Sequence, residues 1–426
     1  MFIYLYYMSS TGTKTIAIFI IALLIGVGVG YGIGPMIGGT QTATSTGPQP
    51  LTGTITIGSL LPLTGDLGSY GENSRSAIEL AENDFNAYLA TMGQTWTLDI
   101  QIEDTATDPV KALEKLQELN AKGIGIVVGP QTSGETRNIK GYADSNNMLL
   151  ISQSSTAPEL AIAGDNVFRF VTDDTRQGPA IARALVNDGV TRIVPVHRGD
   201  AWGDGLVKTT VESFENLGGT ADEGIRYNPE TKEFSADSSI LADKVQAHVD
   251  DVGKGKVAVV YIGFAEAVQF IQASSAHSIL SEVNWYGSDG SAQLAELSSD
   301  PIAAEFAENT NFLNPIFAAS KTSKNKHVVD SVSSQLGRTP DTYAVSAYDI
   351  VWVVGLSILD SGSTDVSTIK VAIPEVVNNY FGALGWIRLN AAGDLATADY
   401  ELWQVIDGEW VQVGIYASST DSIVKS

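Results

Sequence analysis

The segment from Gly129 to Leu160 constrains the fold of this chain more than any other. Two short apolar runs, at 125–128 and 148–151, are typical of buried strands, and each ends at a loop rich in hydroxyl side chains. A helix-like segment follows each loop. In an open α/β sheet, ligands bind beyond the carboxyl ends of the strands, where helix N-termini present free N–H groups. The segment therefore predicts two neighbouring loops that bind a small anionic group, or, more simply, two loops whose Ser and Thr residues cap helices.

The alternation of strands and helices continues along the chain. Strands are expected at 54–61, 97–102, 193–196 and 257–262, and the segments between them carry apolar residues at helical spacing. This order predicts an α/β fold with parallel sheets and helices on both faces. A second set of such units begins after Asp174, and a length of 426 residues agrees with two domains.

Composition excludes several classes of function. The chain has 49 acidic and 25 basic residues, and its formal net charge of −24 argues against a nucleic-acid or anionic-lipid partner. It has no cysteine, which excludes a disulfide, a thiolate metal site and a lipid-modified cysteine anchor. The four histidines are scattered, and neither an HExxH nor a GxxxxGK[ST] motif occurs. No nucleophile–base pair is evident either, so we expect neither enzymatic activity nor a cofactor.

An uncharged and mostly apolar run of 23 residues extends from Thr15 to Ile37. It is long enough to cross the hydrocarbon core of a membrane as a helix. Lys14 is the only charge before this run, which predicts a cytoplasmic segment at 1–14 and an extracytoplasmic location for the rest. We expect a single-pass anchor in the cell membrane, with a cleaved signal peptide as the alternative. Residues 38–53, rich in Thr, Gly and Pro, would form a flexible linker.

Several motifs together resemble the leucine/isoleucine/valine-binding protein family, the type I solute-binding proteins of ABC importers. They occur in the family's order over about 54–413, and the segment 312–371 resembles the family least. The motifs are IGSLLPLTGDLGSYGENSRSAIELAENDFN from Ile57, ISQSSTAPEL from Ile151, FRFVTDDTRQGPAIARAL from Phe168, HRGDAWGDGLVKTTVESFENLGG from His197, KEFSADSSIL from Lys232, VVYIGFAEAVQFIQASSA from Val259 and WYGSDG from Trp285.

The resemblance implies two Rossmann-like lobes with parallel sheets, joined by three hinge crossings near Asp173, Phe312 and Glu401. The first lobe would hold 54–172 plus 312–400, and the second would hold 173–311 plus 401–426. A small-molecule ligand would bind in the cleft between the lobes, and closure of the lobes would bury it.

The resemblance also implies site residues on the first lobe. Ser133, Ser154 and Thr156 correspond to positions that bind the α-carboxylate of an amino acid. Hydroxyl and backbone N–H groups suit that role, because they donate hydrogen bonds without a counter-charge. Tyr70, expected in the first loop, matches an aromatic residue that packs on the ligand. Its alternative role is to close the edge of the domain.

On the second lobe, Trp202 and Phe264 match aromatic positions that are usually tyrosine in the family, which predicts a drier side-chain pocket. Ordinary core packing is the alternative for both rings. Asp289 matches the acidic residue, usually glutamate, that pairs with the ligand's α-ammonium group. Because Asp is one methylene shorter, the ligand would lie closer to this lobe or a water would bridge the pair. The alternative is a simple turn at Asp289 and Gly290.

The implied function is extracytoplasmic capture of a small amino acid, branched-chain or otherwise aliphatic, for delivery to the permease of an ABC importer. A protein that binds an amide, urea or another small polar solute would keep the same lobes and alter the charge pair. A sensory ligand-binding ectodomain is the third alternative. It normally requires a cytoplasmic signalling domain, and about 14 residues precede the apolar run.

Overall fold

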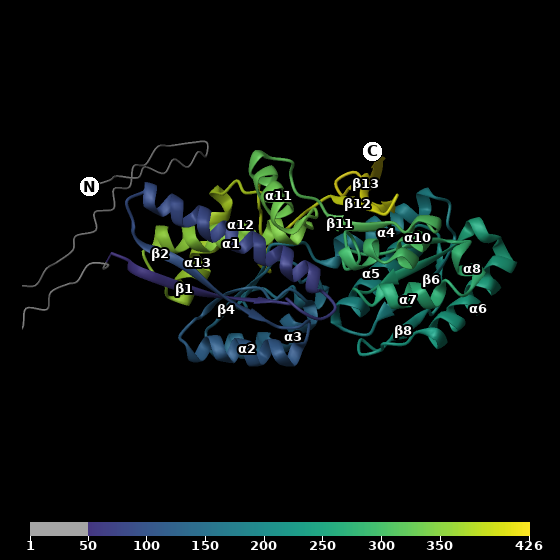
Figure 1. The fold of residues 1–426 in the computed structure, drawn as a ribbon, viewed down its shortest axis with the longest axis horizontal. Coiled ribbons are helices and arrows are strands. Elements are labelled where there is room, and N and C mark those ends of the chain that lie inside the picture. Colours follow the sequence, from purple (N-terminus) through teal and green to yellow (C-terminus); the bar gives the residue numbers. More distant parts are fainter. Residues whose placement is uncertain (1–49) are drawn as a thin grey trace, which may run out of the picture. The chain divides into compact units, whose positions relative to one another are not determined.

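The computed structural model describes residues 50–426. The predicted anchor at 15–37 and nearly all of the linker at 38–53 lie outside the described residues. Within them, strands and helices alternate as predicted, and the strands form two parallel sheets and one antiparallel sheet (Figure 1). The prediction of an α/β fold with parallel sheets is therefore confirmed.

The first sheet is parallel throughout, with the strand order β2-β1-β3-β4-β5. Its strands are β1 (Thr52–Leu61), β2 (Thr95–Asp104), β3 (Ile126–Val128), β4 (Leu149–Ser152) and β5 (Val167–Arg169). The central strands β3 and β4 read as continuous apolar runs because helices cover both of their faces. All five strands run in one direction, so the loops that follow β1, β3 and β4 meet at one edge of the sheet.

Helices pack on both faces of this sheet (Figure 1). Val128 and Ile151 join the apolar cluster of α1 and α12, while Val127 and Leu150 join that of α2 and α3. The helices on this side of the molecule are α1 (Gly68–Thr91), α2 (Pro109–Ala121), α3 (Ser133–Ser145), α11 (Ser323–Leu336), α12 (Thr342–Ser361) and α13 (Val366–Asn379). Among the described helices, α12 alone is long and apolar enough to cross a membrane, and 83% of its apolar stretch is buried in this core.

The second sheet is also parallel, with the order β10-β9-β6-β7 and β8 paired beside β6. Its strands are β6 (Arg192–Arg198), β7 (Thr220–Ala221), β8 (Ile225–Tyr227), β9 (Val257–Ile262) and β10 (Asn284–Tyr286). The helices around it are α4 (Asp174–Asn187), α5 (Ala201–Asn216), α6 (Ser235–Val252), α7 (Ala267–Ser274), α8 (Ser278–Ser281), α9 (Ala295–Ser299) and α10 (Pro301–Asn309). The loops after β6, β9 and β10 again meet at one edge.

The antiparallel sheet has no counterpart in the sequence predictions. It consists of β11 (Asn314–Phe317), β12 (Tyr400–Ile406), β13 (Glu409–Ala417) and β14 (Ser422–Lys425) in that order. Asp407 and Gly408, both at positive φ, form the two-residue turn between β12 and β13. An Asp-Gly pair between apolar runs is a strong local signal for such a hairpin. The predicted lobe boundaries stay a prediction.

The chain after β4 differs from its prediction. The first hydroxyl-rich loop does lead into a helix, α3, whose N-cap Thr132 forms a reciprocal capping box with Glu135. The second loop leads only into a single 3₁₀ turn at Pro158–Leu160. The prediction of a second helix is wrong: Pro158 suits the first position of a helix, but the turn ends at Ala161, whose ψ of 73° is not helical, and Gly164 follows at a positive φ. Of the two hydroxyl-rich loops, only the first therefore leads to the N-terminus of an α-helix.

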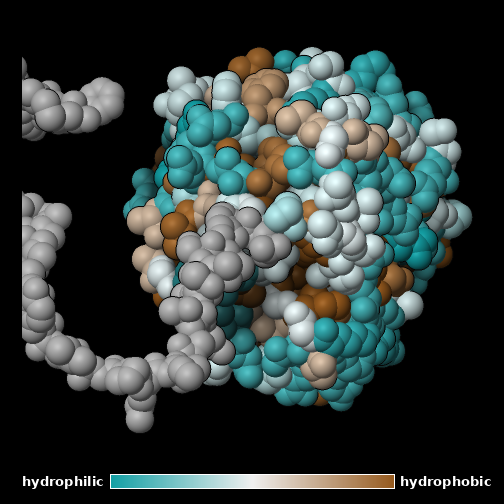
Figure 2. Space-filling view, turned by 90° about the vertical axis from the view of Figure 1, so that its left-hand side faces the viewer, coloured by the Kyte–Doolittle hydropathy of each residue, from teal (hydrophilic) through white to brown (hydrophobic). Residues whose placement is uncertain are grey.

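Polar residues cover most of the face shown in Figure 2, and apolar residues appear there in small groups. A strongly acidic chain with many more Asp and Glu than Lys and Arg residues is expected to have such a surface. Several charged side chains are nevertheless buried inside the molecule.

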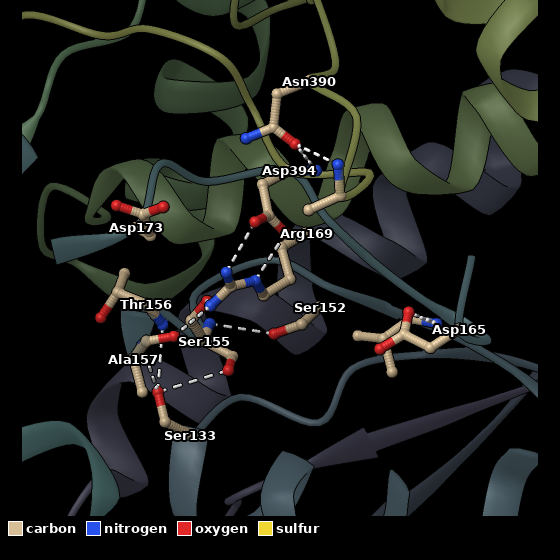
Figure 3. Close-up of polar contacts among 12 residues, drawn as sticks. Ser133, Ser152, Ser155, Thr156, Ala157, Asp165, Arg169, Asp173, Asn390 and Asp394 are labelled. Carbon is tan, nitrogen blue, oxygen red and sulfur yellow. Dashed lines mark hydrogen bonds and ion pairs between the residues drawn. The ribbon is translucent and has the colours of Figure 1, made fainter. Parts of the chain in front are cut away.

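Arg169, at the end of β5, is the most prominent of these buried charges (Figure 3). Its Nε and Nη2 donate to the two carboxylate oxygens of Asp394, at 2.6 and 2.7 Å. Its Nη1 donates to the carbonyl oxygens of Ser155 and Ala157, at 3.1 and 2.8 Å. One guanidinium therefore joins β5, a loop far along the chain and the second hydroxyl-rich loop.

We predict that Arg169→Met lowers the free energy of unfolding by about 3–5 kcal/mol, because it leaves the Asp394 carboxylate buried without a counter-charge. Urea unfolding measures this loss. Arg137→Met is the matched control: Arg137 pairs with Glu159 at 3.3 Å, and the side chains are 64% and 51% exposed. That pair should contribute less than about 1 kcal/mol. If both variants lose the same free energy of unfolding, the buried pair of Arg169 and Asp394 does not have the special role in stability given to it here.

Candidate functional site

A small cavity lies where the loops of the two parallel sheets meet. Residues from both sides and from α12 line it: Leu67, Tyr70, Gln131, Thr132, Ser133, Ser154, Trp202, Phe264, Asp289, Gly290 and Tyr343. Its volume is about 20 Å³, which is room for about one water molecule. An amino acid would enter only if these walls moved apart.

Six of the seven residues predicted from the sequence line this cavity. The seventh, Thr156, is buried beside it, and its N–H donates to the hydroxyl of Ser133 at 3.0 Å. The structure thus brings together residues from six separate segments of the chain. Their role in ligand binding stays a prediction.

The two hydroxyl-rich loops bind each other (Figure 3). The hydroxyl oxygen of Ser133 accepts the N–H groups of Thr156 and Ala157, both at 3.0 Å. The hydroxyl of Ser155 also donates to that of Ser133, at 3.3 Å, so Ser133 acts only as an acceptor in these bonds and keeps its own hydrogen for another acceptor. Ser154 differs, since its hydroxyl donates to the carbonyl oxygen of Gln131 at 2.6 Å. In this arrangement Ser133 is ready to donate to a carboxylate, whereas the hydrogen of Ser154 is already engaged.

An aromatic pair forms the opposite wall. The rings of Trp202 and Phe264 stack with centroids 4.7 Å apart, and the Arg198 guanidinium lies 4.2 Å from the Phe264 centroid. The sequence predicts Trp202 in the loop after the strand at 193–196 and a helix from Gly203. That prediction is wrong, because Trp202 is the second residue of α5, which Asp200 caps by accepting the N–H groups of Trp202 and Gly203. A Cβ on Gly290 would lie 2.5 Å from the Trp202 ring, so the pair fits only against glycine.

Tyr70 likewise belongs to a helix and not to the predicted loop, because α1 begins at Gly68. Its ring is buried, and its hydroxyl donates to the carbonyl oxygen of Asp289 at 3.0 Å and also to that of Ala292. Tyr70 therefore connects α1 to the loop that carries Asp289.

Three residues around Asp289 were not predicted. Tyr343 donates its hydroxyl to the Asp289 carboxylate. Gln177 accepts the N–H of Asp289 at 3.0 Å and donates to the carboxylate of the buried Asp174 at 3.1 Å. Tyr343 lies in the segment that resembles the family least. Asp174 and Gln177 stand within the motif FRFVTDDTRQGPAIARAL, where nothing in the sequence distinguishes them from ordinary residues of a helix start.

The two carboxyl groups share a low-dielectric environment. Burial raises the pKa of Asp289 to about 6, although hydrogen bonds, first that from Tyr343, oppose the shift. Burial also raises the pKa of Asp174 well above its usual range, and the charge of Asp289 adds to that effect. A cation placed beside these groups would relieve both penalties.

Two buried polar atoms in the cavity lining lack a partner among the described residues: the amide nitrogen of Gln131 and one carboxylate oxygen of Asp289. Beside the lining, a hydrogen bond from the Thr156 hydroxyl partly offsets the raised pKa of Asp174. Nearly all buried polar atoms in native proteins have a partner, so the exceptions in the lining need an explanation. The N–H groups at the start of α3 and the free carboxylate oxygen of Asp289 complement a molecule with an anionic end and a cationic end.

Comparison with known proteins agrees with this geometry. The family model described as periplasmic binding protein matches residues 54–409. The chain belongs to this family. An uncharacterized protein of Methanocaldococcus jannaschii is 31% identical over 387 residues, covering 87% of this chain and 91% of the relative. The Leu/Ile/Val-binding protein BraC3 of Rhizobium johnstonii is 26% identical over 353 residues, covering 82% of this chain and 91% of its own.

Solved structures show the same fold. A leucine-binding protein of Thermotoga maritima superposes with a TM-score of 0.71 at 20% identity, covering 85% of this chain and 98% of its own. A solute-binding protein of an ABC transporter from R. palustris, in complex with benzoate, superposes with a TM-score of 0.69 at 19% identity, covering 88% of this chain and 98% of its own. The predicted resemblance to the leucine/isoleucine/valine-binding proteins is thus confirmed, and the chain is a solute-binding protein of the ABC-transporter type, not an enzyme.

The raised pKa of Asp289 predicts a pH-dependent gain of stability in Asp289→Asn. A folded-state pKa of about 6, above the ordinary 3.8, means that ionisation of this group disfavours folding as the pH rises through this window. Two pKa units correspond to at most about 3 kcal/mol. Asparagine still accepts the Tyr343 hydrogen bond but has no charge, so the ligand-free variant should unfold at higher urea at pH 7.5, and its advantage should vanish by pH 4.

Asp243→Asn is the control for this experiment, because it removes a carboxylate from the exposed surface of α6. Urea unfolding curves of both variants and the parent at four values between pH 4 and 7.5 give the comparison. If the free energy of unfolding at pH 7.5 rises no more in Asp289→Asn than in the control, burial of the Asp289 carboxylate does not destabilise the folded protein and the prediction is wrong.

Proposed function

We propose that this protein is the extracytoplasmic binding component of an ABC importer, and that it captures a small amino acid in the cavity and delivers it to the importer's permease. The observation that carries the proposal is the set of unpaired polar atoms. One carboxylate oxygen of Asp289 lacks a partner among the described residues, and Ser133, which lines the same cavity, begins a helix whose first N–H groups have no acceptor within it. An amino acid zwitterion has both complementary groups.

The carboxylate of the ligand would bind at the loop after β3. Ser133 has a hydroxyl hydrogen to donate, and the Thr156 hydroxyl would turn from Asp174 to the ligand. The first N–H groups of α3, at Ser133 and Gly134, have no acceptor within the helix, and the positive end of the helix dipole adds to the attraction. Ser154 would join them after its hydroxyl leaves the carbonyl of Gln131.

The ammonium group would bind at Asp289, with Asp174 as a second carboxylate nearby. Two buried acids without a basic partner in the cavity lining favour a cation at this point. Tyr70, Trp202 and Phe264 would then close over the remainder of the ligand.

Capture would require the two sides of the cavity to separate and close again. The sides are joined here by direct contacts: Ser69 donates its hydroxyl to Glu296 at 2.7 Å, and the N–H of Ala265 donates to the carbonyl oxygen of Asp66 at 3.2 Å. Tyr70 adds its bond to Asp289. Such contacts close a hinged cleft around a ligand that contributes bonds to both sides.

The location follows from the same proposal. Periplasmic-type binding proteins act outside the cytoplasm, and the span predicted at 15–37 would hold this one at the cell membrane in a single pass. The alternative functions fit the cavity less well. An amide, urea or a simple carboxylate such as the benzoate bound by the R. palustris relative would leave the carboxyl groups of Asp174 and Asp289 without a cation. No observation among the described residues favours a sensory ectodomain.

The first test is a thermal-unfolding screen of the full-length protein against the standard amino acids, urea, acetamide and benzoate. A ligand that binds only the native state stabilises it by about 2.7 kcal/mol at a hundredfold excess over its Kd. We expect at least one amino acid to raise the midpoint and the other three solutes to have no effect. A shift with urea, acetamide or benzoate alone would replace the amino-acid proposal.

Titration calorimetry with that amino acid tests the charge pair. Asp289→Asn should weaken binding by about 2–5 kcal/mol, roughly thirty-fold to several-thousand-fold, because the ammonium group loses its partner. Thr156→Ala removes one donor to a charged acceptor and should cost about 1.5–3 kcal/mol. Asp243→Asn should bind like the parent. Unchanged affinity in Asp289→Asn would refute the assignment of the ammonium site.

A further inference from the structure

Gln131 contributes a polar group to the cavity that the proposed binding mode does not use. Its side chain is 1% exposed and lines the cavity. The amide oxygen accepts hydrogen bonds from Gln153 at 3.2 Å and from Ser74 at 3.4 Å. The amide nitrogen has no acceptor among the described residues. Because the oxygen end is occupied, the nitrogen is the end left to donate.

The position of Gln131 relates it to the ligand's side chain. A ligand with its carboxylate at Ser133 and its ammonium at Asp289 has its side chain among the remaining lining residues, which are Leu67, Tyr70, Gln131, Trp202, Phe264 and Tyr343. Tyr70 and Tyr343 already donate their hydroxyls to the Asp289 loop. Gln131 therefore supplies a buried donor to a cavity whose other residues in this set are mostly aromatic.

We propose that Gln131 sets the side-chain specificity of the site, and that the ligand is an amino acid whose uncharged side chain carries a hydrogen-bond acceptor, a carbonyl or hydroxyl oxygen. This inference rests on the proposed function and narrows it. It replaces the expectation of a branched-chain or other aliphatic ligand, because a hydrocarbon would cover the amide nitrogen and leave it unpaired. Sites built to bond a polar group strongly reject analogues that lack it.

The charge of the surroundings limits the ligand to uncharged side chains. Neither Lys nor Arg lines the cavity, so a second carboxylate on the ligand would have no counter-charge. The buried acids Asp289 and Asp174 would also repel it. A cationic side chain would lie beside the donor of Gln131 and find no acceptor there.

Pairs of amino acids with nearly equal shape test the inference. Calorimetry on the full-length protein compares asparagine with leucine and threonine with valine. We expect the polar member of at least one pair to bind about tenfold or more tightly than its apolar partner, as loss of a buried hydrogen bond implies. Gln131→Met keeps the length of the side chain and removes the donor, so it should abolish that preference or reverse it.

Gln101→Met is the matched control, because it makes the same change on β2 outside the cavity lining and should keep the parent's preference. If leucine and valine bind the parent as tightly as asparagine and threonine, this inference is wrong and the proposed function stands. If Gln131→Met keeps the parent's preference, Gln131 is not the determinant. If no amino acid binds the parent, the proposed function fails and this inference fails with it. Should Gln131→Met not fold, the affinities of the polar and apolar amino acids for the parent protein still test the inference.

Discussion

The buried guanidinium of Arg169 is the contact on which the arrangement of the site depends. It donates hydrogen bonds to the carbonyl oxygens of Ser155 and Ala157. The N–H groups of Thr156 and Ala157 then point to the hydroxyl of Ser133. The second loop has no regular helix to hold its shape, since only a 3₁₀ turn follows it. Hydrogen bonds with Arg169 and Ser133 fix the conformation of this second loop, whereas helix α3 fixes that of the first. The polarity of the site thus comes from a fixed backbone more than from flexible side chains.

The buried carboxyl groups at the cavity destabilise the folded protein although they suit the proposed binding of a cation. Asp174 and Asp289 are buried without a basic partner in the lining, which disfavours the folded state at neutral pH. The Tyr343 hydroxyl reduces this penalty at Asp289 but does not remove it, because a hydroxyl donates a hydrogen bond and brings no charge. Proteins retain such unfavourable groups mainly where binding requires them.

The sequence predicted the parts of the structure that depend on local pattern and missed those that depend on distant contacts. Apolar runs bounded by glycine and hydroxyl residues located β3, β4 and β9, and the family motifs placed Ser133, Trp202 and Asp289 around one cavity. Tyr343 was missed because α12 is apolar almost all round and looks like a core helix. The pairing of Arg169 with Asp394, 225 residues apart, has no local signature at all.

The ladder between β11 and β12 bears on how the molecule would open. Asn314 to Phe317 pair with Tyr400 to Trp403 in antiparallel register, close in sequence to two of the predicted crossings, those near Phe312 and Glu401. A ribbon bends readily across its flat face but resists shear along its length, since shear would break every rung at once. A hinge built on it would swing about nearly a single axis. On each closure the two sides of the cavity would then return to the same relative orientation, even without a ligand to align them.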